Sequence, residues 1–419
     1  MKLLINKIAT NNFYVLTIGT IASQFLVLAT FFAIVKFNIY TPKEVGILNI
    51  VLNSVGILAV LFSLRYESAI AKSNTEEEAE QVFWMCIWWN FVFLFLFSSC
   101  FYFIPTAAIY NLGLSNLGVY VYLIPLYTFV LTINQLLILK INRDGNYKLN
   151  AVSKVLNSLL FIIILIVATC FFKNYFSVLN AQFFSLLVVT LLLLYKNKNL
   201  FRTHFDVHTF KSLSKKYIYL PKYFLVSSLF DKLSVNMPLL FINKIFDVSV
   251  AGYFGFSERI LSSPSGVISS SISQILYQDV CKRINIQQEH FSIFASNLRK
   301  LFLMGILPFS ILIIGGDYLA KTLLSEEWQG VGIYLQCIAA IQFIRFMVSP
   351  LSVILLANKE TKILAIWQTS YFISVSVIIG VSYWYKNIKL FLILLVIIEF
   401  VLYSIYLYLI YKSAKKSLL

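Results

Sequence analysis

Two neighbouring hydrophobic stretches decide how this chain is read, Phe224–Phe246 (FLVSSLFDKLSVNMPLLFINKIF) and Gly252–Val280 (GYFGFSERILSSPSGVISSSISQILYQDV). Their charged residues are Asp231, Lys232, Lys244, Glu258, Arg259 and Asp279. Seven serines also lie between Ser262 and Ser273. A charge in the middle of a bilayer costs roughly 2.5–3.5 kcal/mol on insertion scales, so it persists only where it faces protein or water. Several together predict a polar cavity inside the membrane, which favours transport.

The composition is that of an integral membrane protein. The 419 residues are 59% hydrophobic and 12% charged, whereas a soluble domain is about 45–50% apolar and about 25% charged. The net charge is +16. Because the lysines stand beside the ends of hydrophobic segments, membrane topology explains this charge better than a nucleic-acid partner does. The lipid bilayer is therefore the first expected partner, and nucleic acid is not expected.

Hydropathy predicts an all-α polytopic protein with about twelve transmembrane helices. Runs of about 20 apolar residues without strand alternation fit spanning helices rather than barrel strands. The first run is too long for a signal peptide and is expected to remain as a span. The predicted spans lie near 13–35, 45–64, 82–104, 119–139, 151–172, 176–195, 221–245, 251–278, 299–315, 331–356, 363–385 and 390–411.

Lysine and arginine set the expected orientation and the expected domains. Most of them fall in loops on one side, which places both termini in the cytoplasm. The long basic connection 196–222 predicts a cytoplasmic linker between a six-helix lobe at 1–195 and a second at 223–419. Six spans in each lobe give both the same orientation, so a repeat would be parallel. The segments 37–46 and 243–252 resemble each other and support such a repeat, although short loops also look alike by chance.

Helical spacing aligns many of the polar residues. In the eighth span Glu258 begins a stripe of serines, and Arg259 begins an adjacent one. Gln24 in the first span and Asn53 in the second lie on polar faces too. Spans one, two, seven and eight are therefore the expected cavity walls. The alternative is structural, because serine and glycine often serve helix packing in membranes.

The deep charges allow the same two interpretations. Asp231 with Arg259, or Glu258 with Lys232, could form interhelical pairs that hold two helices together. Two further charges, Arg345 and Glu399, lie deep in spans ten and twelve. Glu399 has no basic neighbour in its own span, which favours a protonated carboxyl there.

Signals for catalysis or metal binding are poor. His204 and His208 stand four residues apart in the basic loop without a third ligand, so no metal site is expected. The chain lacks a phosphate-binding loop for nucleotide hydrolysis. The longest exterior loops, 105–118 and 316–330, leave little room for a catalytic domain. We therefore expect a protein that is not an enzyme and has no cofactor, apart from coupling to an H⁺ or Na⁺ gradient.

Four short motifs resemble one known family. They are Leu64-Arg65-Tyr66-Glu67-Ser68-Ala69-Ile70; Ala251-Gly252-Tyr253 followed by Glu258-Arg259-Ile260 and Pro264; Gln274-Ile275-Leu276-Tyr277; and Leu324-Ser325-Glu326-Glu327-Trp328. In the family that these motifs resemble, the last motif usually has Gly at the position of Ser325. Together they are similar to bacterial polysaccharide flippases of the Wzx type, in the multidrug/oligosaccharidyl-lipid/polysaccharide (MOP) exporter superfamily. The resemblance extends over nearly the full chain.

The resemblance implies a MATE-like fold of two lobes around a central cavity in the bacterial cytoplasmic (inner) membrane. The implied substrate is an undecaprenyl-pyrophosphate-linked glycan, used for O-antigen, lipopolysaccharide or capsule synthesis. A polysaccharide polymerase and a chain-length regulator are the implied protein partners. Arginine forms forked contacts with phosphate. The substrate-binding candidates are Arg65, Arg259, Arg345, Lys232, Gln24 and Asn53, and the candidates for ion coupling or for orienting these cations are Asp231, Glu258, Glu67 and Glu399.

Three other classes are weighed against this prediction. A cation-coupled small-molecule or multidrug antiporter of the same superfamily would have an acid-rich cavity, whereas basic residues here at least equal the acids. A major-facilitator transporter would carry a glycine-rich signature after the second span, and residues 72–80 contain no glycine. A membrane enzyme such as a polysaccharide polymerase would need a larger exterior loop.

Overall fold

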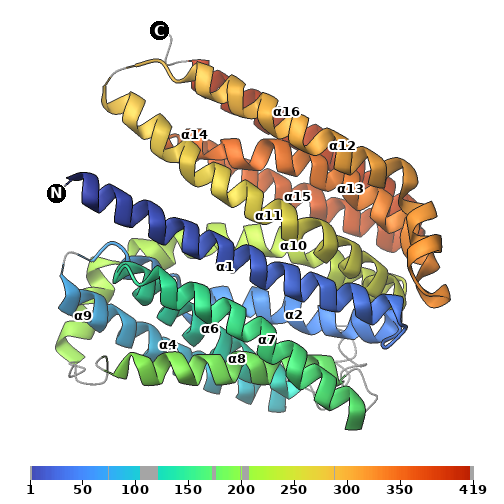
Figure 1. Ribbon diagram of the computed structural model, residues 1–419, viewed down its shortest axis with the longest axis horizontal. Helices are drawn as coiled ribbons and strands as arrows, with labels where there is room; N and C mark the ends of the chain where they lie inside the picture. The colour runs from blue at the N-terminus through green and yellow to red at the C-terminus, as the bar shows by residue number, and fades with distance from the viewer. Residues whose placement is uncertain are drawn as a thin grey trace. The chain divides into compact units, whose positions relative to one another are not determined.

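The computed structural model describes residues 2–73, 75–103, 121–171, 176–198, 200, 207–286 and 288–415, and every regular element in these ranges is a helix (Figure 1). The α-helices are α1 (Lys2–Lys36), α2 (Pro42–Phe62), α3 (Glu67–Ile70), α4 (Glu76–Phe103), α6 (Leu123–Arg143), α7 (Tyr147–Phe171), α8 (Phe176–Lys196), α9 (Val207–Lys216), α10 (Leu225–Ile245), α11 (Val248–Asn285), α12 (Phe291–Leu323), α13 (Gly332–Val348), α14 (Val353–Ala357), α15 (Thr361–Tyr385) and α16 (Ile388–Lys415). Shorter turns are the π-helix η3 (Leu220–Phe224) and the 3₁₀-helices η4 (Glu326–Val331) and η5 (Ser349–Ser352).

Within these ranges, eleven helices are long and apolar enough to cross a membrane. The prediction of an all-α polytopic membrane protein is confirmed. Each of the twelve predicted spans is helical, although the tenth is divided into α13, η5 and α14. The one that is absent from the eleven apolar candidates is α11, the serine-rich eighth span. At 1.5 Å per residue, its 38 residues extend about 57 Å, which is more than enough to span a bilayer. The α11 helix is therefore excluded by its polar composition and not by its length.

The structure tests one of the two predicted exterior loops. The loop predicted at 105–118 lies outside the described residues. The loop predicted at 316–330 is wrong in its first half, because α12 continues to Leu323 and η4 begins at Glu326. An ion pair one helical turn apart, between Lys321 Nζ and Asp317 Oδ2 at 2.6 Å, supports this extra length of helix.

The chain divides into two compact units, each with its own packing. Unit 1 comprises residues 1–32 and 47–236, and unit 2 comprises residues 33–46 and 237–419. The lobe limits taken from the sequence stay a prediction. Much of the expected linker belongs to the core of unit 1, where Leu213, Tyr217 and Leu220 are buried among residues of α4 and α6. Because α9 is amphipathic, its apolar face packs on α4.

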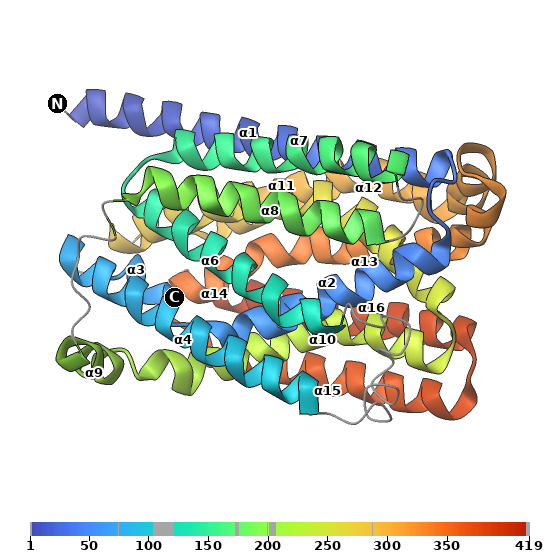
Figure 2. The same cartoon turned by 90° about the horizontal axis from the view of Figure 1, so that it is seen from below.

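Helices of unit 1 pack pairwise. The contacting pairs are α7 with α8, α6 with α8 and α4 with α6. The α1 and α7 helices also lie side by side in Figures 1 and 2. Gly19 allows this approach, because a Cβ at that position would lie 2.7 Å from the Cβ of Ala151. Ser23 and Ser158 hydrogen-bond across the same contact at 2.7 Å.

In unit 2, the central helix is α13, which packs against α11, α12 and α16. Most of its residues are buried, and Gly305 on α12 leaves room for the rings of Phe343 and Phe346. A helix that is apolar on all sides is suited to the interior of a bundle. The polar residues that α13 does carry must therefore find partners inside the protein.

Local hydrogen bonds set the starts of α2 and α11. The backbone N–H of Thr41 donates to Glu44 Oε2 at 2.8 Å, and the N–H of Glu44 donates to Thr41 Oγ1 at 3.4 Å. This reciprocal pair is a capping box, and Pro42 follows it at the first helical position. At the start of α11, the Asp247 carboxylate accepts from the N–H of Ser249 at 2.6 Å.

Two glycines let the first turns of α2 and α11 meet at backbone contact within unit 2. A Cβ on Gly46 would lie 2.1 Å from the carbonyl oxygen of Val248, and a Cβ on Gly252 would lie 1.9 Å from that of Pro42. The two clashes mirror each other, since each glycine is the fifth residue of its helix. The similar segments 37–46 and 243–252 thus pack directly on each other.

The motif 324–328 forms an anchor at the end of α12. Trp328 is fully buried, and its indole N–H donates to the carbonyl oxygen of Tyr40 at 3.1 Å. The hydroxyl of Ser325 donates to the carbonyl of Val35 at 2.9 Å. On α11, the hydroxyl of Tyr253 donates to the carbonyl of Glu327 at 2.8 Å. The motifs around Tyr253 and Trp328 therefore hold unit 2 together at this end.

Candidate functional site

The α11 helix combines a packed face with an exposed polar face. Ser265 is buried, and its hydroxyl donates to the carbonyl of Leu261 at 2.6 Å. The stripe that begins at Arg259 becomes exposed at Gly266, where a Cβ would meet nothing within 4 Å. Ser270 and Gln274 on this stripe are exposed too. Exposed polar groups along a helix of membrane length require water or a polar ligand and not lipid.

Several serines of α11 satisfy their hydroxyls within the helix. Ser270 and Ser271 both donate to the carbonyl of Val267, at 2.9 Å and 3.0 Å. Ser273 donates instead to the carbonyl of Pro350 at 3.4 Å. A hydroxyl that donates to its own backbone still has lone pairs for a ligand. The stripe can thus accept hydrogen bonds without losing helix stability.

The deepest charge in unit 2 is an ion pair between α13 and α16. Arg345 Nε donates to Glu399 Oε2 at 3.1 Å, and Arg345 Nη2 forms a second, ion-paired contact with Glu399 Oε1. The hydroxyl of Tyr371 on α15 accepts from Arg345 Nη2 at 2.7 Å and also donates to Glu399. Glu399 is fully buried. The basic neighbour that its own span lacks, Arg345, comes from α13.

Aromatic rings surround this ion pair. Trp367 stacks on Tyr371 with ring centroids 5.3 Å apart and on Tyr406 at 4.1 Å. Tyr403 contacts Trp367 edge to face at 5.2 Å. Such a wall excludes water and strengthens the electrostatic interaction inside it. Sequence reasoning missed Tyr371, because nothing distinguishes this tyrosine from the many other aromatic residues of the chain.

The pairing of Arg345 bears on its predicted role. Two nitrogens of its guanidinium, Nε and Nη2, donate to the Glu399 carboxylate. Glu258 on α11 lies close enough to interact electrostatically with both residues. An arginine matched in this way has little charge left for a substrate. The pair and the Tyr371 hydroxyl connect α13, α15 and α16, and the roles predicted for Arg345 in substrate binding and for Glu399 in ion coupling or cation orientation stay predictions.

The turn after α2 positions Arg65. Leu64 and Arg65 both have positive φ, at 49° and 64°, so two consecutive left-handed residues lie in the turn between α2 and α3. Arg65 Nη1 donates to Glu67 Oε1 at 3.0 Å, and the Ser63 hydroxyl donates to the other carboxylate oxygen. The Arg65 side chain remains 34% exposed. Glu67 thus holds one N–H group of Arg65, and the predicted part of Arg65 in substrate binding stays a prediction.

Polar groups on α1, α2 and α7 lie inside unit 1. Asn53 Nδ2 donates to the carbonyl of Asn49 at 2.8 Å. Lys154 Nζ donates to Thr20 Oγ1 at 3.0 Å. Gln24 is half-buried, and its Oε1 has no hydrogen-bond partner among the described residues. The predicted ligands Gln24 and Asn53 are both present in unit 1, but the structure does not bring them into one hydrogen-bonded group.

The remaining predicted residues are on α10 and α11. Asp231 and Lys232 are exposed on α10 within unit 1, whereas Arg259 and Glu258 are partly buried on α11 within unit 2. The suggested pairs of Asp231 with Arg259 and of Glu258 with Lys232 would join the two units and stay predictions. Their roles in binding or coupling stay predictions as well.

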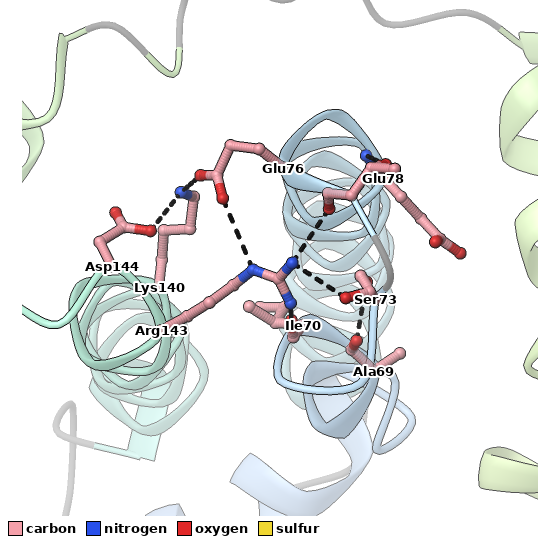
Figure 3. A network of polar contacts seen from close by, with 9 residues as sticks. Ala69, Ile70, Ser73, Glu76, Glu78, Lys140, Arg143 and Asp144 are labelled. Carbon is pink, nitrogen blue, oxygen red and sulfur yellow. Dashed lines mark hydrogen bonds and ion pairs between the residues drawn. The ribbon is translucent and has the colours of Figure 1, made fainter. Parts of the chain in front are cut away.

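An arginine at the end of α6 holds the connection between α3 and α4 (Figure 3). Arg143 donates to the carbonyl oxygens of Ile70 at 2.5 Å, Ser73 at 2.9 Å and Thr75 at 3.0 Å. Its Nε also lies 3.6 Å from a carboxylate oxygen of Glu76. This planar group satisfies carbonyls that the short helix α3 leaves unpaired.

Two more cations extend this network. Lys140 pairs with Glu76 and, at 2.7 Å, with Asp144. Lys216 on α9 pairs with Glu78, and this hydrogen bond raises the pKa of the Lys216 ammonium above its ordinary value. The network therefore ties α4, α6 and α9 together at one end of unit 1.

The described residues contain no cluster of three or more His, Cys, Asp or Glu that could hold a metal ion. His204 and the side chain of His208 lie outside the described part of the chain.

Comparison with solved structures defines the class of protein. An inward-facing multidrug resistance MATE family transporter of the MOP superfamily matches with a TM-score of 0.69 and 13% identity over 96% of this chain and 95% of that chain. A MOP superfamily transporter from Pyrococcus furiosus, whose title describes a binding pocket of reversed polarity, matches at 0.67 and 13% over 98% and 96%. The MATE multidrug transporter DinF-BH, solved with a bound ligand, matches at 0.63 and 15% over 96% and 95%. The chain is therefore a multi-pass membrane protein with the MATE/MOP fold.

The family profile described as "Polysaccharide biosynthesis protein" matches residues 38–333. The chain therefore belongs to this polysaccharide biosynthesis family, and the resemblance noted in the sequence is confirmed for family and fold. No curated protein sequence matches the chain.

Proposed function

We propose that the protein is a flippase that moves an undecaprenyl-pyrophosphate-linked oligosaccharide repeat unit from the cytoplasmic to the periplasmic leaflet of the bacterial inner membrane. Membership of the polysaccharide biosynthesis family, over residues 38–333, carries this proposal. The MOP fold supports it, because the solved relatives are transporters. Alternating access of two lobes would move the headgroup while the polyprenyl tail stays in lipid.

The polar face of α11 provides the physical support. A diphosphate bearing sugars cannot cross hydrocarbon unaided, since desolvating its charges and hydroxyls is prohibitive. Its route must offer cations to the diphosphate and hydroxyls or amides to the sugars. The α11 stripe of Arg259, Ser263, Ser270 and Gln274 has this composition. Arg65 supplies a second, partly exposed guanidinium in unit 1.

Other predicted roles follow from the same proposal. Lys232, Gln24 and Asn53 would assist in binding the headgroup. Asp231 and Glu258 would orient the cations or carry an H⁺ or Na⁺ that couples transport to an ion gradient. A polysaccharide polymerase and a chain-length regulator would take up the product on the periplasmic side, for O-antigen, lipopolysaccharide or capsule.

The test is complementation of a null strain. We expect the null strain to accumulate lipid-linked repeat units in the inner leaflet and to lose surface polysaccharide. Wild-type protein should restore both, whereas the double variant R65Q/R259Q should not, at equal abundance in the membrane. The matched control K148Q neutralises an exposed lysine on α7 and should complement fully. Normal surface polysaccharide with R65Q/R259Q would contradict the assigned roles, and an unchanged null strain would contradict the function.

A cation-coupled small-molecule antiporter is the second candidate. The observation that favours it is the similarity to MATE multidrug transporters, one of them solved with a bound ligand. At 13–15% identity this similarity concerns the fold alone. A drug-susceptibility panel on the null strain separates the two functions. Increased susceptibility with unchanged surface polysaccharide would favour the antiporter.

A further inference from the structure

A basic cavity lies in unit 2 where α11 ends and α12 begins. Its volume is about 560 Å³. The charged residues that line it are Asp279, Lys282, Arg283 and Lys300, and the main uncharged polar ones are Gln288, Ser292, Ser296 and Asn297. None of the helix faces discussed above contributes to it. Three cations thus surround one pocket that contains a single carboxylate.

The cations of this cavity are available to a ligand. Among the described residues, Lys282, Lys300 and Asp279 form no ion pair with one another or with other side chains. Lys282 and Lys300 are exposed. Their long side chains can therefore turn toward an anion without breaking an existing contact.

Arg283 differs from the two lysines because the protein fixes its position. Arg283 Nη1 donates to the carbonyl of Glu289 at 2.7 Å and to Ser292 Oγ at 3.1 Å. These two bonds hold the guanidinium against the turn between α11 and α12. The other N–H groups of the guanidinium remain, and such a fork matches the geometry of a phosphate. The cavity therefore contains one positioned cation and two mobile ones.

The cavity lies at the boundary between a charged and an apolar surface. The first exposed large hydrophobic side chains of α12 are Phe302, Leu303 and Met304, directly after Lys300. With 33 residues, α12 is about 50 Å long and exceeds the hydrocarbon thickness of about 30 Å. Because Arg299 and Lys300 precede this apolar run, the first turns of α12 are the ones expected outside the hydrocarbon. The cavity thus lies at the depth of lipid headgroups, in the leaflet that the lysine and arginine pattern assigns to the cytoplasm.

We propose that this cavity binds the phosphate-bearing headgroup of a membrane lipid. Three cations suit a phosphate or diphosphate, and the amides and hydroxyls of Asn297, Gln288 and Ser296 suit the hydroxyls of an attached sugar or glycerol. The lipid is either an anionic bilayer lipid or the lipid-linked saccharide before it enters the transport path. The second source rests on the proposed function, whereas the first does not.

Native mass spectrometry of the full-length protein tests this proposal. The protein is released from phosphatidylcholine nanodiscs doped with phosphatidylglycerol in one arm and undecaprenyl diphosphate in the other. We expect the wild type to retain at least one of these lipids. The variant K282Q/K300Q should retain it roughly 25-fold less, because each lysine that attracts a lipid headgroup contributes about a fivefold factor. Arg283 is left unchanged because its hydrogen bonds hold the turn.

The matched control is K412Q/K415Q, which removes two exposed lysines at the end of α16 that do not line the cavity. It should retain lipid as the wild type does. Equal retention by K282Q/K300Q and the wild type, or equal loss in both variants, would overturn the proposal. A thermal melt of each variant confirms that it is folded, which is expected because neither lysine of the cavity makes a contact that the fold needs.

The two arms distinguish the sources of the phosphate. Retention of both lipids assigns the cavity to anionic bilayer lipids, and retention of undecaprenyl diphosphate alone assigns it to the transported lipid. Either result supports a headgroup site. Failure of the proposed function would be seen elsewhere, as a wild-type protein that does not restore surface polysaccharide whatever lipids it retains.

Discussion

The pair of Arg345 and Glu399 allows a direct test of which deep charges are structural. Replacing Arg345 with Met leaves the fully buried Glu399 carboxylate with only the Tyr371 hydroxyl as a hydrogen-bond partner. Breaking a buried ion pair in this way destabilises a protein by about 3–5 kcal/mol. Replacing Glu399 with Gln leaves the guanidinium uncompensated and should have a similar effect.

The double variant R345M/E399L should behave differently from either single variant. Apolar residues of similar volume remove both charges together, and such replacements of buried pairs are often neutral or stabilising. For a unit of this size, about 1 kcal/mol shifts Tm by about 2–4 °C, so we expect each single variant to melt roughly 10 °C below the wild type. The double variant should melt near the wild type.

Thermal unfolding of the purified protein measures the stability of each variant. The amount of surface polysaccharide in the complemented null strain measures its transport activity. If the pair only holds α13, α15 and α16 together, R345M/E399L should keep its stability and its export. Single variants that melt like the wild type would refute the structural assignment. A double variant that is stable and yet inactive would show that Arg345 or Glu399 acts on the substrate or the coupling ion.

Three further predictions concern the backbone crossing, the α3–α4 connection and the start of α12. Gly252→Ala places a Cβ 1.9 Å from a carbonyl oxygen, so it should lower the unfolding free energy by at least about 2 kcal/mol. The control Gly266→Ala has open space around its Cβ and should be neutral or slightly stabilising in the same thermal melt. Arg143→Gln removes hydrogen bonds to three carbonyls and should lower the unfolding free energy by about 2–4 kcal/mol. The control Lys148→Gln changes an exposed residue and should leave the stability unchanged. Equal melting temperatures of the two variants would refute the role of Arg143. Burial, with Arg283 nearby, lowers the pKa of His290 below its ordinary value of 6.5. The unfolded chain then binds more protons just below pH 6.5, so the stability from this histidine is complete above that pH and is lost as the pH falls toward the lowered pKa. His290→Gln should flatten the plot of Tm against pH below pH 6.5. An unchanged slope would show that His290 does not cause this loss of stability.

Helix positions were predictable because hydrophobic length dominates in a membrane. Each predicted span is helical. The ends agree to within eight residues, except that α1 begins at Lys2, eleven residues before the predicted start. A second error was at Gly316–Leu323, where α12 continues and an ion pair one helical turn apart supports the extra length. The polarity of α11 was also readable from its serines alone.

The candidate site was predictable only in part. Motifs marked Arg65 and Glu67, and the structure joins them in an ion pair. Helical spacing predicts one face of α11 for Arg259 and Gln274, and Gln274 is exposed there. It gave no sign of Tyr371, because the partners of a buried charge come from other helices.

The sequence by itself determined the membrane class, the approximate positions of the spans, the polar helix and the family motifs, since each depends on local composition or on short spacing. Only the tertiary structure decided which charges are neutralised. Arg345 and Glu399 are 54 residues apart, and Arg143 reaches carbonyls about 70 residues away. Electrostatic and hydrogen-bond energies fall steeply with distance in space and do not depend on separation along the chain. Only the packing of helices, therefore, separates a structural arginine from one that remains available to a substrate.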